Sequence, residues 1–218
     1  MGKIMRLKDK VAIVTGGAHG MGEAEARLFA TEGAKVIVAD ILGSDAERVA
    51  ADIRAGGGEA AAAQIDVTSE AEWRDLIAKA VATYGRLDIL VNNAGISGSS
   101  VGDPDGLEGW HRIIAVNQTS VFLGTKLAAE QMAKTGGGSI VNISSIMGFV
   151  GSASGHPAYH ASKGAVRIYS KAAAEALASL LRPRPDFSLT WLGENMAWAK
   201  EVGERLLAGL RKAGLPAR

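Results

Sequence analysis

The sequence predicts an α/β fold in which helices cover both faces of a parallel sheet. Short runs rich in Val, Ile and Ala recur along the chain, and segments with helical spacing of apolar residues separate them. A glycine-rich turn joins the first of these runs to the first helical segment. A strand with apolar side chains on both faces must be buried on both faces. These observations favour a doubly wound parallel sheet in a single domain.

Four strands and three helices are expected in the first half of the chain. We predict strands at residues 11–15 and 34–40, one ending at 65–67, and one in 87–95 that runs into a glycine turn. The helix at 22–32 has Ala24, Leu28 and Phe29 as its apolar positions, and the helix at 44–55 ends at the glycine run 56–58. Thr68 or Ser69 caps a third helix. Its core residues are Trp73, Leu76, Ile77 and Ala80.

The second half continues the alternation. Residues 107–134 are expected to form two helical pieces, which the glycine run 136–138 ends. Residues 139–145 (SIVNISS) are predicted to be the fifth strand, and an Ala-rich helix is predicted from 158 to 181. These segments complete a domain from residue 1 to residue 181.

The composition excludes several classes of function. The formal charge is +1 and no basic block occurs, so a nucleic-acid partner is not expected. No uncharged apolar run reaches the ~18 residues of a membrane helix, and the N-terminus has no signal-like apolar stretch. We therefore expect a cytoplasmic protein without a membrane partner. The sequence holds no Cys, and its His residues lack metal-ligand spacing, so no catalytic metal is expected.

The turn at residues 15–22 reads TGGAHGMG. Glycine there allows a tight turn and close approach of the backbone to a pyrophosphate, and the following helix offers free N–H groups and a positive dipole end. On its own, such a turn is equally consistent with a plain strand-to-helix connection. The dinucleotide contacts that we expect from it are Gly16, His19, Gly20, Met21 and Gly22.

Asp40 ends the second expected strand, where a carboxylate accepts hydrogen bonds from the adenosine ribose. The 2′-phosphate of NADP would meet like charge at this place. Neither Lys nor Arg occurs in the glycine loop or next to Asp40, where His19 and Ile41 stand instead. The sequence therefore favours NAD over NADP, the alternative being that Asp40 only starts a loop.

Tyr159 and Lys163 follow the fifth expected strand at positions i and i+4, so they share one face of a helix. An ammonium group near a phenol favours the phenolate and lowers a pKa that starts near ~10. Such a phenol exchanges a proton closer to neutral pH. The same spacing also occurs by chance, so it needs support from other motifs.

Five motifs in one order resemble the short-chain dehydrogenase/reductase family. They are TGGAHGMG at 15–22, NNAG from Asn92 to Gly95, Asn117, Ser145, and YHASK from Tyr159 to Lys163. The resemblance covers roughly residues 7–178. Within the family, the sequence is similar to NAD-dependent hydroxysteroid and related secondary-alcohol dehydrogenases. This resemblance implies a Rossmann-like sheet and hydride transfer between NAD and a small-molecule secondary alcohol or ketone.

The resemblance also implies a role for each matched residue. Tyr159 would be the general acid/base, and Lys163 would lower its pKa and bind the nicotinamide ribose. Ser145, rather than Ser144, would orient the substrate oxygen, and Asn117 would hold a water of the proton relay. Further cofactor contacts implied by the family are Asp66, Val67, Asn92, Ala94 and Gly95.

The substrate pocket is expected to involve Ser97, Ile146, Phe149 and His156. For His156 the alternative is an ordinary loop histidine. Ser145 lacks the G-x-S-x-G turn of a hydrolase nucleophile, which speaks against hydrolysis. Trp73 and Trp110 fall within helical patterns and are expected to be packing residues.

The chain after residue 181 departs from the family pattern. Gly193-Glu194 stands where the family has Pro-Gly, and the usual seventh strand is missing from the sequence. We expect an atypical segment, 182–218, packed on the same domain, with a strand at 186–192 and a helix at 195–210 that covers the exposed sheet edge.

Two alternatives to a working enzyme follow from that departure. One is a non-catalytic or inactive NAD-binding protein, and the other is a dimerising scaffold. The helices at 107–134 and 158–181 pair between subunits in the family, so a homodimer is expected with or without activity.

Overall fold

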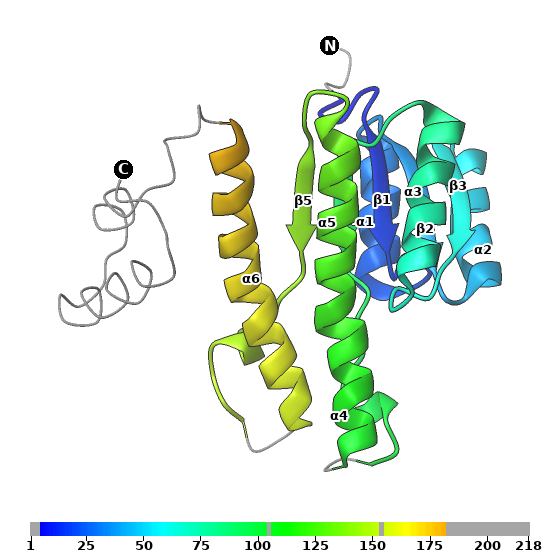
Figure 1. The fold of residues 1–218 in the computed structure, drawn as a ribbon. Helices are drawn as coiled ribbons and strands as arrows, with labels where there is room; N and C mark the ends of the chain where they lie inside the picture. Colours follow the sequence, from blue (N-terminus) through cyan, green and yellow to red (C-terminus); the bar gives the residue numbers. More distant parts are fainter. Residues whose placement is uncertain (1–4, 104–105, 153–154, 182–218) are drawn as a thin grey trace, which may run out of the picture. The chain divides into compact units, whose positions relative to one another are not determined.

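A computed structural model describes residues 5–103, 106–152 and 155–181, with side chains to residue 176 (Figure 1). Its contacts divide the chain into two units, Met1–Ser170 and Lys171–Arg218. The sheet and the candidate site belong to the first unit. The strand expected at 186–192, the helix expected at 195–210 and the atypical segment 182–218 lie outside the described residues.

The sheet is parallel throughout and has the strand order β3-β2-β1-β4-β5. Its strands are β1 (Val11–Thr15), β2 (Lys35–Asp40), β3 (Glu59–Gln64), β4 (Ile89–Asn92) and β5 (Ser139–Asn142). The chain reverses its direction of travel across the sheet between β3 and β4, so β1 and β4 flank the switch point. In such sheets ligands bind beyond the carboxyl ends of the strands at this point. The predicted fold class is confirmed.

The helices follow the predicted alternation (Figure 1). They are α1 (Gly20–Thr31), α2 (Gly43–Ala55), α3 (Glu70–Tyr84), α4 (Leu107–Ile114), α5 (Ser120–Ala133) and α6 (Pro157–Leu181). A π-helical turn, Ala115–Thr119, joins α4 to α5, so the two predicted pieces form one helical run. Within the described part of the chain, none of the helices combines the length and the apolar character needed to cross a membrane.

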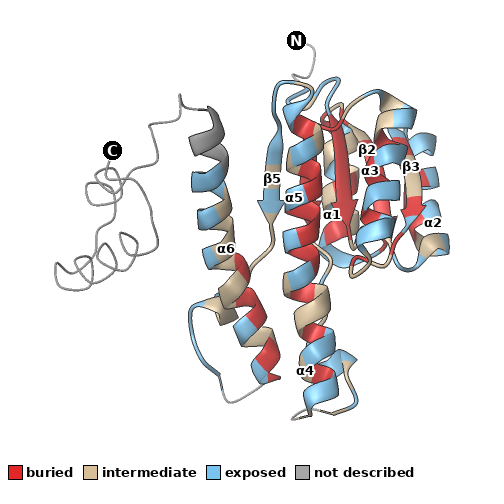
Figure 2. Ribbon diagram, in the orientation of Figure 1, coloured by how far each residue is buried: buried red, intermediate tan, exposed pale blue. Residues whose placement is uncertain are grey.

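Two hydrophobic cores flank the sheet (Figure 2). The first lies between the sheet and helices α3 and α5, with Trp73 fully buried in it. The indole N–H of Trp73 donates to the carbonyl oxygen of Val67 at 2.8 Å, which satisfies its one polar group. The second core lies between the sheet and helices α1 and α2. The four predicted core residues of α3 are all buried.

The predicted apolar face of α1 is confirmed only at Phe29, which is half-buried against the second core. Ala24 is exposed and Leu28 is 52% exposed, whereas Gly22 and Ala26 are buried. The helix approaches the sheet through its smallest residues, because a close helix–strand contact leaves no room for larger side chains. Of the large apolar residues predicted for this helix, Phe29 therefore lies on the buried side and Leu28 does not.

Strand β5 differs from the expectation that every strand is buried on both faces. Its burial alternates between exposed and half-buried residues, and Val141 is 43% exposed. Among the described residues β5 pairs only with β4, which makes it an edge of the sheet. Strand β3 also ends earlier than predicted, at Gln64, because Asp66 turns the chain by accepting hydrogen bonds from Thr68.

Candidate active site

The glycine loop between β1 and α1 has a tightly packed end and an open end. Gly16 and Gly20 have φ values of +65° and +57°, in the left-handed region that favours glycine. A Cβ on the buried Gly22 would overlap the carbonyl oxygen of Gly16, whereas one on Gly20 would meet nothing within 4 Å. His19 precedes α1 without a side-chain cap, and Met21 is exposed. The first-turn amides of α1 are therefore available to an anion.

Thr15 and Asn93, which the sequence analysis did not assign to the site, join this loop to the end of β4. The Thr15 hydroxyl donates to the carbonyl oxygen of Val91 and accepts from the main-chain N–H groups of Asn93 and Ala94, each at 3.1 Å. The Asn93 side-chain amide donates to the carbonyl oxygens of Thr15 at 3.0 Å and Gly16 at 3.2 Å. The two residues hold the glycine loop in place.

Asn92, which was expected among the cofactor contacts, faces the other way. Its side chain is buried and its amide donates to Oδ1 of Asn142 at 2.8 Å, between β4 and β5. Successive residues of a strand point to opposite faces, so only one of the two asparagines in NNAG faces the loop. That one is Asn93. The structure does not bring the Asn92 side chain to the glycine loop.

Asp40 closes the glycine loop from the end of β2. One carboxylate oxygen accepts the main-chain N–H of Ala18 at 3.1 Å, and the other accepts that of Leu42 at 3.0 Å. His19, inside the loop, lies with its Nε2 2.8 Å from a carboxylate oxygen of Asp45. The predicted acidic residue thus adjoins the loop on which the expected pyrophosphate would lie.

The structure places a cation, Arg48, at the glycine loop, which the sequence did not predict. Arg48, in α2, donates through Nη2 to the carbonyl oxygen of Ala18 at 3.0 Å and pairs with Glu23 at 3.3 Å. The expectation that no Lys or Arg accompanies the loop considered only neighbours in sequence. Packing of α2 beside α1 brings Arg48 there. The presence of a basic residue in the helix after Asp40 is the signal that could have found it.

Asp66 and Val67, expected beside the adenine, form the connection between β3 and α3. The Asp66 carboxylate accepts from the main-chain N–H of Thr68 at 2.9 Å and from its hydroxyl at 2.7 Å. Val67 is buried in the first core. Both residues follow the carboxyl end of β3, on the same edge of the sheet as the glycine loop.

Tyr159 and Lys163 lie on one face of α6, as their spacing predicts. The Lys163 ammonium is 5.9 Å from the centroid of the Tyr159 ring. Tyr159 is half-buried, whereas Lys163 is only 5% exposed. Lys163 Nζ donates to the carbonyl oxygen of Ile143 at 2.7 Å, which fixes the ammonium at the end of β5. A partly accessible phenol thus lies beside a buried cation.

Asn117 connects this pair to the end of β4. It is fully buried in the π-helical turn, where its side chain exchanges two hydrogen bonds with the main chain of Ile96, both at 2.8 Å. A Cβ on Gly95 would lie 3.3 Å from Asn117 Oδ1 and 3.6 Å from Lys163 Nζ. Gly95, Asn117 and Lys163 therefore meet at one point. An irregular turn at such a point is frequent at functional sites.

The two serines after β5 have different partners. The Ser144 hydroxyl donates to the carbonyl oxygen of Lys163 at 2.7 Å, so its proton is used within the fold. Ser145 Oγ accepts from the N–H of Met147 at 3.2 Å, which leaves its own proton free to donate. Gly148 packs against the main chain of Lys163, where a Cβ would lie 2.7 Å from that carbonyl oxygen. The loop containing both serines is fastened to α6.

Burial lowers the pKa of Lys163 below its usual value, because an ammonium loses hydration when it is buried. Below the folded-state pKa both the folded and the unfolded chain hold the proton, and burial of the charge reduces stability in full. Between that pKa and the usual value only the unfolded chain holds it, so stability rises with pH. The ligand-free protein should therefore gain stability across this window.

We compare the free energy of unfolding of wild type with that of Lys163→Met. Wild type minus variant is expected to increase as the pH rises from the lowered pKa of Lys163 toward the usual lysine pKa, by at most about 1.4 kcal/mol per pH unit. Urea unfolding of the ligand-free proteins at a series of pH values measures this difference. Lys79→Met is the matched control, since exposed Lys79 also donates to a main-chain carbonyl, that of Ala62 at 2.6 Å. A difference that stays constant with pH would contradict the assignment of a buried ammonium.

The residues expected to line a substrate pocket vary in exposure. Ser97, Ile146 and Phe149 are exposed, and the Arg167 guanidinium lies 4.0 Å from the centroid of the Phe149 ring. His156 is buried, and its Nδ1 accepts the main-chain N–H of Ala158 at 3.1 Å. That bond places the proton of a neutral His156 on Nε2. Contact of these residues with substrate stays a prediction.

The sequence profile of the short chain dehydrogenase family matches residues 10–180. Together with the parallel sheet, the glycine loop and the Tyr159–Lys163 pair, this match shows that the chain belongs to the short-chain dehydrogenase family. The predicted resemblance is confirmed. The matched range ends with α6 and contains every residue that the sequence analysis placed in the catalytic and cofactor sites.

Three curated relatives are similar to this chain. The 2,5-dichloro-2,5-cyclohexadiene-1,4-diol dehydrogenase LinX of Sphingobium indicum is 49% identical over 78% of the chain and 67% of its own length. The 3-alpha-(or 20-beta)-hydroxysteroid dehydrogenase of Mycobacterium tuberculosis is 43% identical over 78% and 64%. The NADP-dependent (R)-specific alcohol dehydrogenase of Lentilactobacillus kefiri is 44% identical over 78% and 67%. Each match spans about two thirds of the relative.

Proposed function

We propose that this chain transfers a hydride between NAD and a secondary alcohol or ketone, with Tyr159 as the general acid/base. The observation that carries the proposal is the half-buried Tyr159 ring beside the buried Lys163 ammonium, 5.9 Å apart, next to the switch point of the sheet. The names of the relatives support it, since a cyclic diol, a hydroxysteroid and an (R)-alcohol all carry an oxidisable CH–OH group.

The glycine loop fits a dinucleotide. Gly20 leaves open space, no side chain caps α1, and the first-turn amides suit a pyrophosphate. Lys163 has further N–H donors beyond the one used on Ile143, and these suit the hydroxyls of the nicotinamide ribose. Ala94 and Gly95 would border the cofactor, and Asp66 and Val67 would flank its adenine. When bound, the nicotinamide supplies a hydride acceptor or donor at its C4.

NAD rather than NADP is proposed because of the charge around the adenosine end. Asp40 faces the loop, and Asp45 and Glu23 add negative charge beside it. The Arg48 guanidinium is paired with Glu23, which reduces its attraction for another anion. A relative that uses NADP shows that this choice varies within the family.

The proposed proton path uses groups that the fold leaves free. During oxidation Tyr159, as phenolate, takes the hydroxyl proton of the alcohol while the hydride leaves the carbinol carbon. In the reverse direction it returns the proton to the oxygen. The free Ser145 proton donates to the substrate oxygen and orients it. The Lys163 ammonium lies beside the Tyr159 ring. Asn117 would hold a water through the second lone pair of its Oδ1, since both of its amide N–H groups donate within the fold, to Ile96 and Ser162.

Steady-state reduction of NAD tests this function. Purified protein is incubated with NAD and a panel of cyclic, aliphatic and steroidal secondary alcohols, and NADH is followed by absorbance. The proposal predicts turnover with at least one secondary alcohol and much lower activity with NADP. NADH binding in a fluorescence titration without turnover on any alcohol or ketone would favour the non-catalytic alternative instead.

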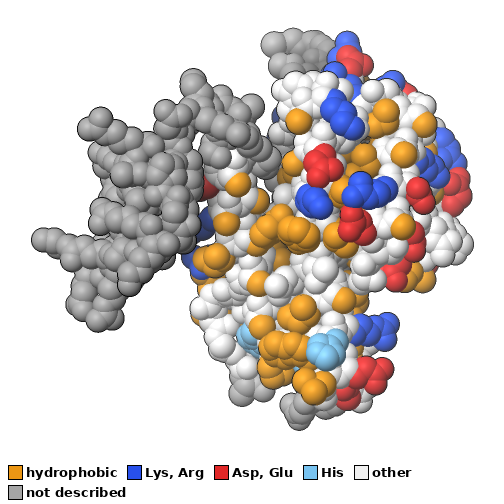
Figure 3. All heavy atoms as spheres, viewed as in Figure 1, with side chains coloured by type: hydrophobic (Ala, Val, Ile, Leu, Met, Phe, Trp, Pro, Cys, Tyr) orange, Lys and Arg blue, Asp and Glu red, His pale blue; other side chains and the backbone are white. Residues whose placement is uncertain are grey.

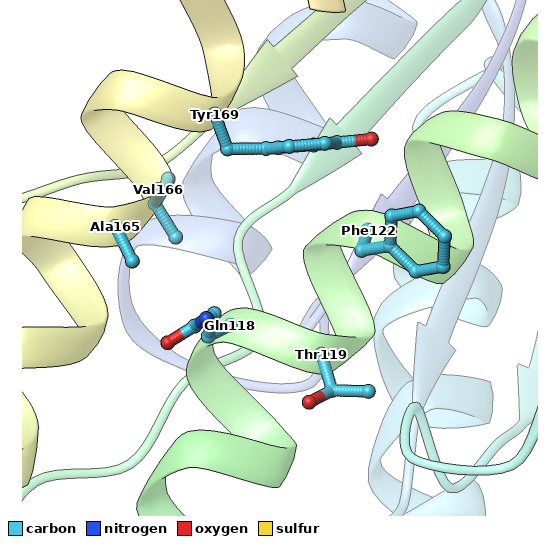
Figure 4. A pocket seen from close by; sticks show the side chains of 6 residues that line it. All are labelled: Gln118, Thr119, Phe122, Ala165, Val166 and Tyr169. Carbon is cyan, nitrogen blue, oxygen red and sulfur yellow. The ribbon is translucent and has the colours of Figure 1, made fainter. Parts of the chain in front are cut away.

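A homodimer through α5 and α6 is proposed as well. Figure 3 shows hydrophobic side chains gathered on the face that presents α4 and α5, where Phe122 is 47% exposed. Beside it a groove of about 290 Å³ is lined by residues of the π-helical turn, α5 and α6. In Figure 4 the Tyr169 ring reaches toward Phe122, and the two rings meet edge to face at 6.0 Å. Such an apolar surface is typical of protein contacts.

Phe122→Arg is expected to weaken dimerisation by about 30-fold or more, equivalent to about 2 kcal/mol, because a central aromatic anchor becomes a charge. Sedimentation velocity over a dilution series measures the change. Leu28→Arg is the control, since Leu28 is similarly exposed on α1. A wild-type monomer at all concentrations, or an unchanged dimer in Phe122→Arg, would contradict the proposed interface.

A further inference from the structure

The residue Ala18 of the glycine loop is held between two opposite charges. Its N–H donates to the Asp40 carboxylate at 3.1 Å, and its carbonyl oxygen accepts from the Arg48 guanidinium at 3.0 Å. Because one residue contacts both groups, Asp40 and Arg48 border the same end of the loop. This is the end where a carboxylate at the close of the second strand meets the adenosine ribose.

Arg48 is a partly exposed cation whose partners are one main-chain oxygen and two carboxylates. Its side chain is 45% exposed, and it pairs with Glu23 at 3.3 Å and with Asp52 at 3.7 Å. A planar guanidinium binds a phosphate through two parallel N–H groups, so it can exchange a carboxylate partner for a phosphate. The exposure of the Arg48 side chain permits that exchange without refolding of α2.

The charges around the Ala18 end of the glycine loop disfavour binding of a 2′-phosphate as long as Asp40 is present. Arg48 and Arg27 face the carboxylates of Glu23 and Asp52, and Asp40 adds a further negative charge at the loop. A 2′-phosphate bound near Asp40 would be repelled at close range. Removal of that one carboxylate would leave Arg48 as the nearest charged group on Ala18.

We propose that Arg48 is a specificity-determining residue, a phosphate-binding cation that Asp40 prevents from accepting the 2′-phosphate of NADP. The inference rests on the proposed function, because it concerns the same dinucleotide site. In this arrangement the Asp40 carboxylate opposes the 2′-phosphate of NADP, and the residue that would bind that phosphate is already in place.

Binding measurements on four variants test the inference without any need for turnover. The full chain is titrated with NADH and NADPH by fluorescence, and with adenosine 2′,5′-bisphosphate by calorimetry. The variants are Asp40→Ser, Asp40→Ser with Arg48→Gln, Asp40→Ser with Arg27→Gln, and Arg48→Gln alone. Arg27 is the matched control, because it bonds Glu23 and Asp52 at 2.7 Å and none of its hydrogen bonds among the described residues reaches the loop.

Asp40→Ser is expected to strengthen NADPH binding by about tenfold or more, equivalent to about 1.4 kcal/mol, and to weaken NADH binding. Arg48→Gln should remove the NADPH gain from Asp40→Ser, whereas Arg27→Gln should keep it. The affinity for adenosine 2′,5′-bisphosphate should change among the variants in the same order as the affinity for NADPH. This would show that the change in affinity arises at the 2′-phosphate.

Two results would overturn the inference. One is an NADPH gain that survives Arg48→Gln as well as it survives Arg27→Gln. The other is an equal loss of NADH and NADPH binding in Arg48→Gln, which would make Arg48 only a support of the loop. If wild type binds neither NADH nor NADPH, the proposed function itself fails. If Asp40→Ser still binds NADH but does not bind NADPH more tightly than wild type, only the inference about Arg48 fails.

Discussion

Tyr159→Phe is expected to lower kcat by about 10³-fold while the dissociation constant of NADH changes by no more than about twofold. The substitution removes the hydroxyl that is proposed to exchange the proton with substrate and keeps the ring beside Lys163. The proposed cofactor contacts on the glycine loop are left intact. Steady-state kinetics and an NADH titration on the same preparation measure the two quantities.

Tyr169→Phe is the matched control for this experiment. Tyr169 lies on the same helix, but its ring packs against Phe122 and its hydroxyl bonds Thr125, away from Lys163. Its replacement should leave kcat close to that of wild type. If Tyr159→Phe keeps more than a tenth of wild-type kcat, Tyr159 is not the general acid/base.

Gly22→Ala is expected to impair both stability and NADH binding. Alanine in a helix is intrinsically favoured over glycine by about 1 kcal/mol. Here the new Cβ would overlap the Gly16 carbonyl oxygen and lie 2.6 Å from Nδ2 of Asn93, and overpacking of this kind costs about 1–3 kcal/mol. The clash involves main chain that cannot move without deforming the glycine loop, so the unfavourable effect should dominate.

Gly56→Ala, at the end of α2, is the control that distinguishes the steric overlap in Gly22→Ala from the general effect of replacing glycine by alanine at a helix. Gly56 has a negative φ, and a Cβ there would make only ordinary contacts of 3.5 Å. We expect little change in stability and none in NADH binding. Urea unfolding and NADH titration of both variants provide the comparison. Equal behaviour of Gly22→Ala and Gly56→Ala would show that the loop is not packed as described.

The elements that the sequence predicted well carry a local signal. Strands β1 and β2 are continuous apolar runs, and α3 is capped by Ser69, whose hydroxyl accepts the N–H of Glu72 at 3.3 Å. The buried face of α1 could be predicted only in part from apolar residues, because the helix packs through Gly22 and Ala26 as well as through Phe29. The exposure of β5 depends on which segment lies beside it, a long-range property that its own residues do not encode.

The same distinction applies to the candidate site. Tyr159 and Lys163 are one helical turn apart, so their proximity follows from spacing alone. The contact of Arg48 with Ala18 joins elements separated by a strand, and only the packing of α2 beside α1 creates it. The support that Asn93 gives the loop likewise depends on the register between β1 and β4.

Transfer of deuterium from a labelled alcohol tests the proposed hydride transfer. A secondary alcohol labelled with deuterium at its carbinol carbon is incubated with NAD and the purified chain, and the NADH formed is analysed by mass spectrometry. A hydride-transferring dehydrogenase predicts that each NADH carries one deuterium and that each alcohol becomes the corresponding ketone. NADH that forms without the label, or a protein that binds NADH yet forms no labelled NADH from any alcohol on which its relatives act, would contradict the account.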